Sequence, residues 1–241
     1  MPAPRFHTLT VGETRRETDD ALILGHRLSE CCGHAPLLEE ELALANIGLD
    51  LIGQARALYD YAGAIEGDGR DQDALAYLRD APEFRNLLLV EQPNGDFAMT
   101  IARQFLYSAY AAPFWRATAN SDDATLAGIA ATAQHENAYH LRHTSDWLIR
   151  LGDGTDESHR RAQNALDALW VYTGEMFEGD SATLRGEWDE TVDGVLAEAA
   201  LARPKDGWMQ TGGRRGRHSE HLGYILAELQ FLQRAYPGAS W

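Results

Sequence analysis

The sequence contains few of the β-branched aliphatic residues that sheets favour, with 5 valines and 8 isoleucines among 241 residues. Alanine and leucine, which favour helices, number 36 and 30. This imbalance excludes an all-β fold. It also argues against a parallel α/β sheet, because the buried strands of such a sheet are runs of valine and isoleucine. We therefore expect an all-α protein.

Basic residues and cysteines are also scarce. The 21 lysines and arginines stand against 37 aspartates and glutamates, a formal net charge of −16 that disfavours nucleic acid and membrane surfaces as partners. No apolar run reaches the roughly 20 residues that span a bilayer, and the N-terminus lacks the apolar core of a signal peptide. The two cysteines, Cys31 and Cys32, are adjacent, which makes a loop-closing disulfide between them implausible, so we expect buried, reduced thiols. We expect a cytoplasmic protein.

Along most of the chain, apolar residues recur at the three- and four-residue spacing of amphipathic helices. The predicted helices span residues 18–32, 37–66, 71–78, 97–119, 121–151, 155–177, 180–202 and 219–235. Residues 1–16 are expected to be irregular, and residues 81–92 form an apolar connector. Because no low-complexity linker interrupts the pattern, we expect residues 1–241 to form one domain, a four-helix bundle with accessory helices.

Bundles of this kind often hold two irons or manganeses through a Glu from each of two helices and a Glu-x-x-His motif from each of the other two. This chain does not supply those ligands. Residues 97–119 contain no acidic residue, and Asp50 is followed three positions later by Gly53. Glu136 is followed three positions later by Tyr139, with His140 one position too late. We therefore expect no metal and no catalytic residue in this chain.

Polar side chains occupy the interior positions where such a metal would be held. Asn46, Asp50 and Gln54 recur every four residues along an otherwise apolar helix. Buried polar groups need hydrogen-bond partners, and a buried carboxylate also needs a cation. Candidate partners lie on the two following long helices: Arg103, Gln104, Glu136 and His140. Our hypothesis is a hydrogen-bonded polar core in place of a metal.

Three further features are candidates for contact with a partner. One is the aromatic end of helix 97–119, with Tyr107, Tyr110, Phe114 and Trp115, although these residues would equally fill a core. The second is the face of helix 37–66 around Gly48 and Gly53, and the isolated chain is expected to self-associate through the patch that these two features form. The third is the basic loop Gly212–Arg217, which either receives a phosphate or acidic surface or is simply solvated.

Several segments of the chain resemble one protein family. They are CGHAP (32–36), LALANIGLDLIGQAR (42–56), NLLLVEQPNGDFA (86–98), YHLR (139–142), WLIRLGDGTD (147–156) and TGGRRGRHSEHLG (211–223). In the same order, over about residues 20–241, they resemble the C-subunit family of the multicomponent phenylacetyl-coenzyme A epoxidase, also called phenylacetic acid degradation protein C.

The resemblance implies a ferritin-like helical bundle that has lost its irons and acts as a structural subunit. It implies pairing with a homologous A subunit that holds the di-iron centre, within a complex that includes further subunits and a reductase carrying flavin and an iron–sulfur cluster. With NADPH and O₂, that complex adds one oxygen atom across the aromatic ring of phenylacetyl-coenzyme A. The competing hypothesis is an autonomous ferritin-like di-iron oxidase or oxygenase.

The resemblance also implies that substrate approaches the connector, at Glu83, Phe84, Arg85 and Asn86. There Arg85 is expected to meet a phosphate, and Phe84 either the acyl or pantetheine chain or simply the core. The sequence departs from the family by its short passage from Glu178 to Ser181, so any family contact in that segment is not expected here.

Overall fold

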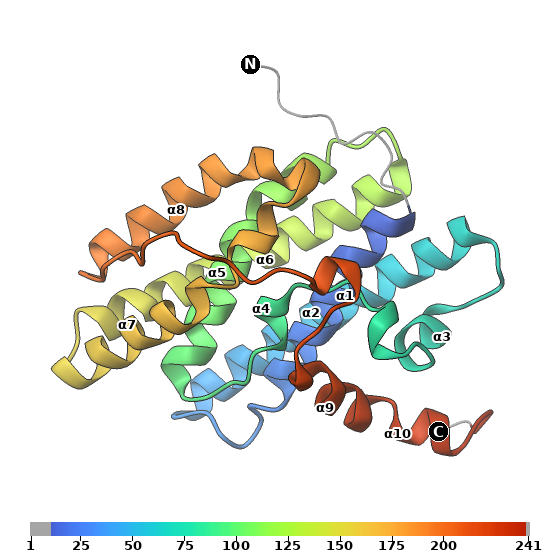
Figure 1. Ribbon diagram of the computed structural model, residues 1–241, viewed down its shortest axis with the longest axis horizontal. Helices are drawn as coiled ribbons and strands as arrows, with labels where there is room; N and C mark the ends of the chain where they lie inside the picture. Colours follow the sequence, from blue (N-terminus) through green and yellow to red (C-terminus); the bar gives the residue numbers. More distant parts are fainter. Residues whose placement is uncertain (1–10, 240–241) are drawn as a thin grey trace. The chain divides into compact units, whose positions relative to one another are not determined.

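The computed structural model describes residues 11–239, with side chains from residue 16 onward. The described part contains helices, turns and irregular segments but no strand, which confirms the all-α prediction (Figure 1). None of its helices is both long and apolar enough to cross a membrane. The described residues divide into two compact units: 94–211, here the central unit, and 11–93 together with 212–239, here the terminal unit.

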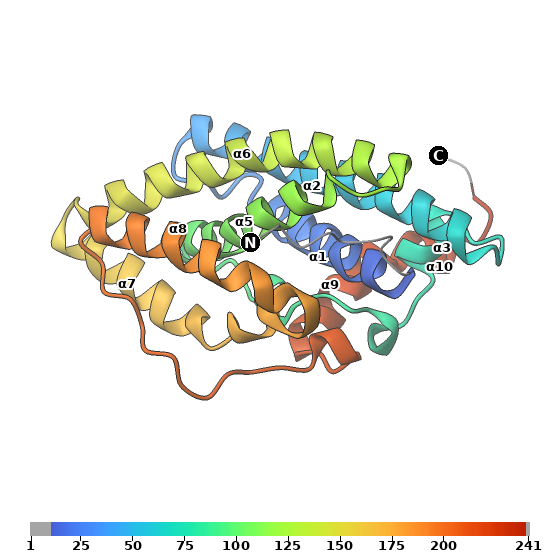
Figure 2. The ribbon, with the colours of Figure 1, turned by 90° about the horizontal axis from the view of Figure 1, so that it is seen from above.

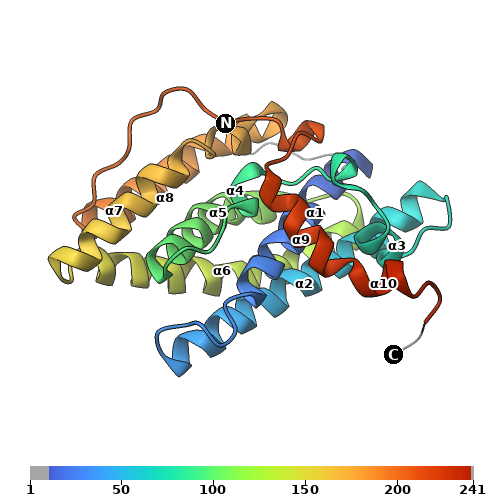
Figure 3. The ribbon, with the colours of Figure 1, turned by 60° about the horizontal axis from the view of Figure 1, so that its bottom comes forward.

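The terminal unit is built on two long helices, α1 (Val11–Ser29) and α2 (Leu38–Glu66), which pack side by side in opposite directions (Figure 3). A Cβ atom on Gly25 of α1 would lie 3.1 Å from the Gly48 carbonyl oxygen of α2, so glycine at this crossing permits close packing. The remaining elements are α3 (Gln72–Tyr77), a 3₁₀ turn (Ala81–Glu83), α4 (Leu88–Glu91), a second 3₁₀ turn (Gly213–Arg215), α9 (Glu220–Leu229) and α10 (Phe231–Ala235).

The central unit pairs α5 (Phe97–Thr118) with α6 (Ala124–Gly152), and α7 and α8 pack against α5 (Figure 2). Helix α7 spans Asp156–Trp170, 3₁₀ turns follow at Gly174–Phe177 and Gly179–Leu184, and α8 spans Arg185–Glu198. Side chains cap two of these helices: Asp96 accepts a hydrogen bond from the Met99 amide at 3.0 Å, and Thr155 forms a capping box with Ser158.

The aromatic end of α5 fills the core of the central unit. Tyr107, Tyr110, Phe114 and Trp115 are all buried. Tyr110 lies with its ring centroid 6.2 Å from that of Phe114 and 6.0 Å from that of Phe177. The prediction that these aromatics form an exposed interface is therefore wrong for this chain, because α5 is covered on several sides by the other helices of its unit.

Four local predictions need correction. Residues 11–16 are helical, since α1 begins at Val11 and continues through Glu13, Arg15 and Arg16, which favour a helix without an apolar repeat; residues 1–10 lie outside the described part. Helix α7 ends at Trp170, where the Thr173 hydroxyl donates a hydrogen bond to the Trp170 carbonyl oxygen. The last helix breaks at Gln230, whose side-chain amide donates to Ala76 and Arg79 carbonyls. Cys32 is exposed and Cys31 half-buried, since both lie in the turn after α1.

Candidate functional site

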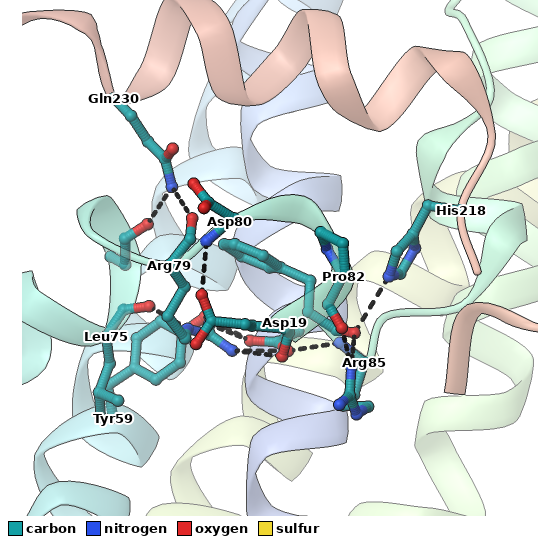
Figure 4. A network of polar contacts seen from close by, with 12 residues as sticks. Asp19, Tyr59, Leu75, Arg79, Asp80, Pro82, Arg85, His218 and Gln230 are labelled. Carbon is teal, nitrogen blue, oxygen red and sulfur yellow. Dashed lines mark hydrogen bonds and ion pairs between the residues drawn. The ribbon is translucent and has the colours of Figure 1, made fainter. Parts of the chain in front are cut away.

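The connector of residues 81–92, where the resemblance places substrate contacts, lies within the terminal unit against α1 (Figure 4). Two consecutive carboxylates of α1 accept hydrogen bonds from backbone N–H groups of the connector. Asp19 accepts from the Arg85 amide at 2.7 Å, and Asp20 accepts from the Leu87 amide at 2.6 Å. Both aspartates are fully buried, so the extended backbone of the connector is bonded to charged groups in a water-poor environment.

Arg79, just after α3, neutralises Asp19. Its Nη2 lies 2.6 Å from Asp19 Oδ1, and the Tyr59 hydroxyl of α2 donates to the same oxygen at 2.6 Å. The guanidinium also stacks 4.1 Å from the centroid of the Phe84 ring and donates to the backbone carbonyls of Leu75 and Glu83. Arg79 thereby ties α1, α2, α3 and the connector together (Figure 4).

Burial and neighbouring charges shift the pKa values of several groups around the connector. Although burial of Arg79 opposes its charged form, the Asp19 carboxylate raises the pKa of Arg79 above its ordinary value. The pKa of the Tyr59 hydroxyl is raised well above 10.0 by burial and by the Asp19 charge. The pKa of Asp20 is raised well above 3.8 by burial and by the Glu17 charge, although Arg214 and the Leu87 amide act in the opposite direction.

The loop from Gly212 to Ser219 closes over the connector from the opposite side. Arg214 is buried, donates to the Arg85 carbonyl at 3.0 Å and pairs with Asp20 at 2.8 Å. A Cβ on Gly216, whose φ is +75°, would lie 2.3 Å from the Pro82 carbonyl oxygen, so only glycine fits. Of the predicted basic cluster, Arg214 therefore turns inward, whereas Arg215 and Arg217 are exposed.

His218, in the same loop, also contacts the connector. Its Nδ1 lies 2.5 Å from Glu91 Oε1 and its Nε2 lies 3.0 Å from the Phe84 carbonyl oxygen. The Phe84 carbonyl can only accept, so Nε2 is the donor in that contact, while Nδ1 faces the Glu91 carboxyl group. Ser219 donates its amide and hydroxyl to the other oxygen of Glu91, at 2.8 and 2.6 Å.

The four connector residues have different exposures. Phe84 and Asn86 are fully buried, which agrees with Phe84 as a core residue. Glu83 is exposed and accepts from the Asp80 amide at 2.8 Å, whereas Arg85 is half-buried and donates from Nη1 to the Pro82 and Phe84 carbonyls, both at 2.6 Å. Of these four predicted residues, therefore, Glu83 and Arg85 are the two that an external molecule can reach.

Sequence reasoning missed the residues that hold the connector: Asp19, Asp20 and Arg79. The signal was present in the stretch DDALIL (19–24), where two acids join an apolar helix pattern, because a charge on an apolar face requires a buried partner. The partner itself was not visible, since Arg79 lies 60 residues away in the chain.

The predicted polar-core residues belong to both units. In the central unit, Arg103, Gln104 and His140 are fully buried and Glu136 is half-buried. Gln104 donates to the Ser108 hydroxyl at 3.0 Å, and Arg103 donates to Asn94 Oδ1 at 2.5 Å.

On α2 of the terminal unit, Gln54 is buried, Asp50 is half-buried and Asn46 is exposed. A buried stripe is therefore wrong at Asn46, because that position lies on the uncovered side of α2. The pairing of these residues with those of α5 and α6 stays a prediction.

The donor set does not fit a di-iron centre. Helix α5 places a buried cation and a buried amide, Arg103 and Gln104, in an interior where such a centre needs carboxylates. Over residues 16–239, no three His, Cys, Asp or Glu side chains are grouped so that they could hold a metal ion. The metal content of the purified chain stays a prediction.

Comparison with known proteins gives two matches that span nearly the whole chain. The model of a family described as phenylacetic acid catabolic protein matches residues 10–241. A curated Escherichia coli (strain K12) protein, named as the C subunit of 1,2-phenylacetyl-CoA epoxidase, is 48% identical over 242 residues, which cover 95% of this chain and 97% of the relative.

Proposed function

Because the chain belongs to the phenylacetic acid catabolic protein family, we propose that it is the C subunit of a phenylacetyl-coenzyme A epoxidase and has no catalytic activity of its own. The observation that carries this proposal is the 48% identity to the curated epoxidase component, which extends over 97% of that relative. A match over 95% of this chain and 97% of the relative favours the same role in an assembly rather than a shared fragment.

The interior of the central unit supports a role without catalysis. Di-iron chemistry needs carboxylate and histidine ligands from four helices. Helix α5 instead carries a fully buried arginine, Arg103, whose fixed positive charge repels metal cations. The chemistry would then belong to a di-iron A subunit, supplied with electrons by a flavin and iron–sulfur reductase.

The network around the connector supports a positioning role. Asp19, Asp20, Arg79 and Arg214 fix the connector backbone through buried ion pairs. A segment bonded from two sides presents its outward residues in a constant geometry, which lowers the entropy cost of binding. We propose that Arg85 and Glu83 form the part of the connector that faces phenylacetyl-coenzyme A or the A subunit, while Phe84 and Asn86 act only by holding the backbone.

Metal analysis and turnover of the purified chain test this proposal against an autonomous di-iron oxygenase. We expect no stoichiometric iron and no oxygenated product when the chain is supplied with iron, reductase, NADPH and phenylacetyl-coenzyme A. About two bound irons per chain together with product formation would overturn the non-catalytic assignment and favour the autonomous enzyme.

A further inference from the structure

Helix α2 carries an apolar face that the other elements of the terminal unit leave exposed. Leu38, Leu42 and Leu49 are 69%, 58% and 66% exposed. With half-buried Ala45 and exposed Gly53 they follow the spacing of one helix face, residues 38, 42, 45, 49 and 53. We call these five residues the α2 stripe. At 1.5 Å per residue, the stripe is about 22 Å long, or four helical turns.

No close contact among the described residues requires a glycine at position 53. A glycine inside a helix destabilises it relative to alanine. Gly48 is explained by α1, since a Cβ there would lie 3.4 Å from the Gly25 carbonyl oxygen. A Cβ on Gly53 would meet nothing within 4 Å. In a stripe of exposed leucines, a small residue of this kind lets the backbone of a second helix approach closely.

The charges beside the stripe indicate what covers it. At 3.6 residues per turn, Glu39 lies on one flank, Glu41 lies on the other, and Asp60 continues the face toward its C-terminal end. The cation on this face is Arg56, whose Nε donates to Gln72 at 2.9 Å. A second copy of the chain would bring the same acids opposite one another, which disfavours a homodimer through this face.

We propose that the α2 stripe docks a helix of the A subunit whose apolar face is flanked by lysine or arginine residues. This inference rests on the proposed function. The leucines supply the apolar contact, Ala45 and Gly53 set the close approach of the two helices, and the flanking acids fix orientation through charge complementarity. The sequence predicts an interface around Gly48 and Gly53; the proposed interface is the α2 stripe, which includes Gly53 but not Gly48.

One substitution at Gly53 is expected to change two quantities in opposite directions: it should stabilise the isolated chain and weaken binding to the A subunit. In the isolated chain, Gly53→Leu replaces a weak helix former by a strong one in open space, so the unfolding temperature should rise by about 2 °C. The added side chain stands where the partner backbone must pass, so the Kd for the A subunit of the same organism should rise by at least about 30-fold.

Gly194 on α8 offers a matched control. It is also an exposed helix glycine whose Cβ would meet nothing within 4 Å, but its neighbours Glu190 and Glu198 are exposed acids rather than leucines. Gly194→Leu should raise the unfolding temperature equally and leave the Kd unchanged. A second variant, Leu42→Glu with Leu49→Glu, should also weaken binding without lowering the unfolding temperature, because both side chains are already solvated.

The outcomes separate this inference from the proposed function. Loss of A-subunit binding in both α2 variants, with Gly194→Leu binding like the unaltered chain, supports the stripe as the docking surface. Unchanged binding in both α2 variants overturns the inference and leaves the proposed function intact. Failure of the unaltered chain to bind the A subunit overturns the proposed function. Dimerisation that only the α2 variants abolish assigns the stripe to a second copy and overturns the stated partner.

Discussion

Replacing Arg79 with leucine removes the cation that neutralises the buried Asp19 carboxylate. The pair is 2.6 Å apart, with 3% and 0% of the two side chains exposed, so the carboxylate left behind has no access to bulk water. The Tyr59 hydroxyl and the Arg85 amide remain as donors to Asp19, but neither carries charge. Removing one member of a buried pair costs about 3–5 kcal/mol, and we expect this loss in the free energy of unfolding.

Urea unfolding at 25 °C, followed by tryptophan fluorescence and circular dichroism, measures this loss. For a chain of this length the same change lowers the unfolding temperature by about 6–20 °C. The exposed pair of Arg116 and Glu187, with side chains 55% and 58% accessible, provides the control. Arg116→Leu should cost less than about 1 kcal/mol.

Neutralising the stranded carboxylate should restore part of the stability lost at Arg79. The double variant Asp19→Asn with Arg79→Leu should be less destabilised than the sum of the two single variants by at least about 1 kcal/mol. If Arg79→Leu costs no more than Arg116→Leu, or if the two single changes simply add, the connector is not held by this ion pair and the reasoning about its rigidity fails.

Three further predictions concern the same fold. Because the folded state raises the pKa of Asp20, it holds that proton more tightly than the unfolded state, so this group's contribution to stability falls as pH rises above 3.8. Asp20→Asn should therefore gain stability relative to the unaltered chain between pH 4 and pH 7, and a urea-melt difference that stays constant or reverses contradicts this assignment. Gly216→Ala should cost about 1–3 kcal/mol in urea melts, because φ is +75° and its Cβ would meet the Pro82 carbonyl; a silent change would show that the loop shifts freely. Tyr110→Asp should prevent folding rather than only assembly, as measured by circular dichroism; a folded variant would place Tyr110 outside the core.

Local chemistry was sufficient to locate many of the helix ends. Asp96, Thr155 and Gly67 act through hydrogen bonds or backbone angles within a few residues, so their roles could be predicted from spacing alone. The break at Gln230 could not, because its amide bonds to carbonyls of Ala76 and Arg79 that lie about 150 residues earlier. Contacts of this kind depend on how elements pack, which no local pattern contains.

In the candidate site, too, some features could be predicted from the local sequence and others depend on how the helices pack. The acid-free helix α5 could be predicted from composition, and the structure adds that its polar residues Arg103 and Gln104 are fully buried. The burial of Tyr110 could not be predicted, because an aromatic stripe at helical spacing suits a core and an interface equally. The side of α2 that remains uncovered was likewise invisible, since Gly48 and Gly53 look alike in sequence and differ only in whether α1 lies against them.

The most direct test of the proposed role is epoxide formation by the A subunit measured with and without this chain. Reductase, NADPH, O₂ and phenylacetyl-coenzyme A are held constant, and product is quantified by mass spectrometry. A non-catalytic C subunit predicts no product from this chain with reductase, little from the A subunit alone, and full activity only when both are present. Product formed by this chain in the absence of the A subunit, or activity of the A subunit that does not depend on this chain, would contradict the account.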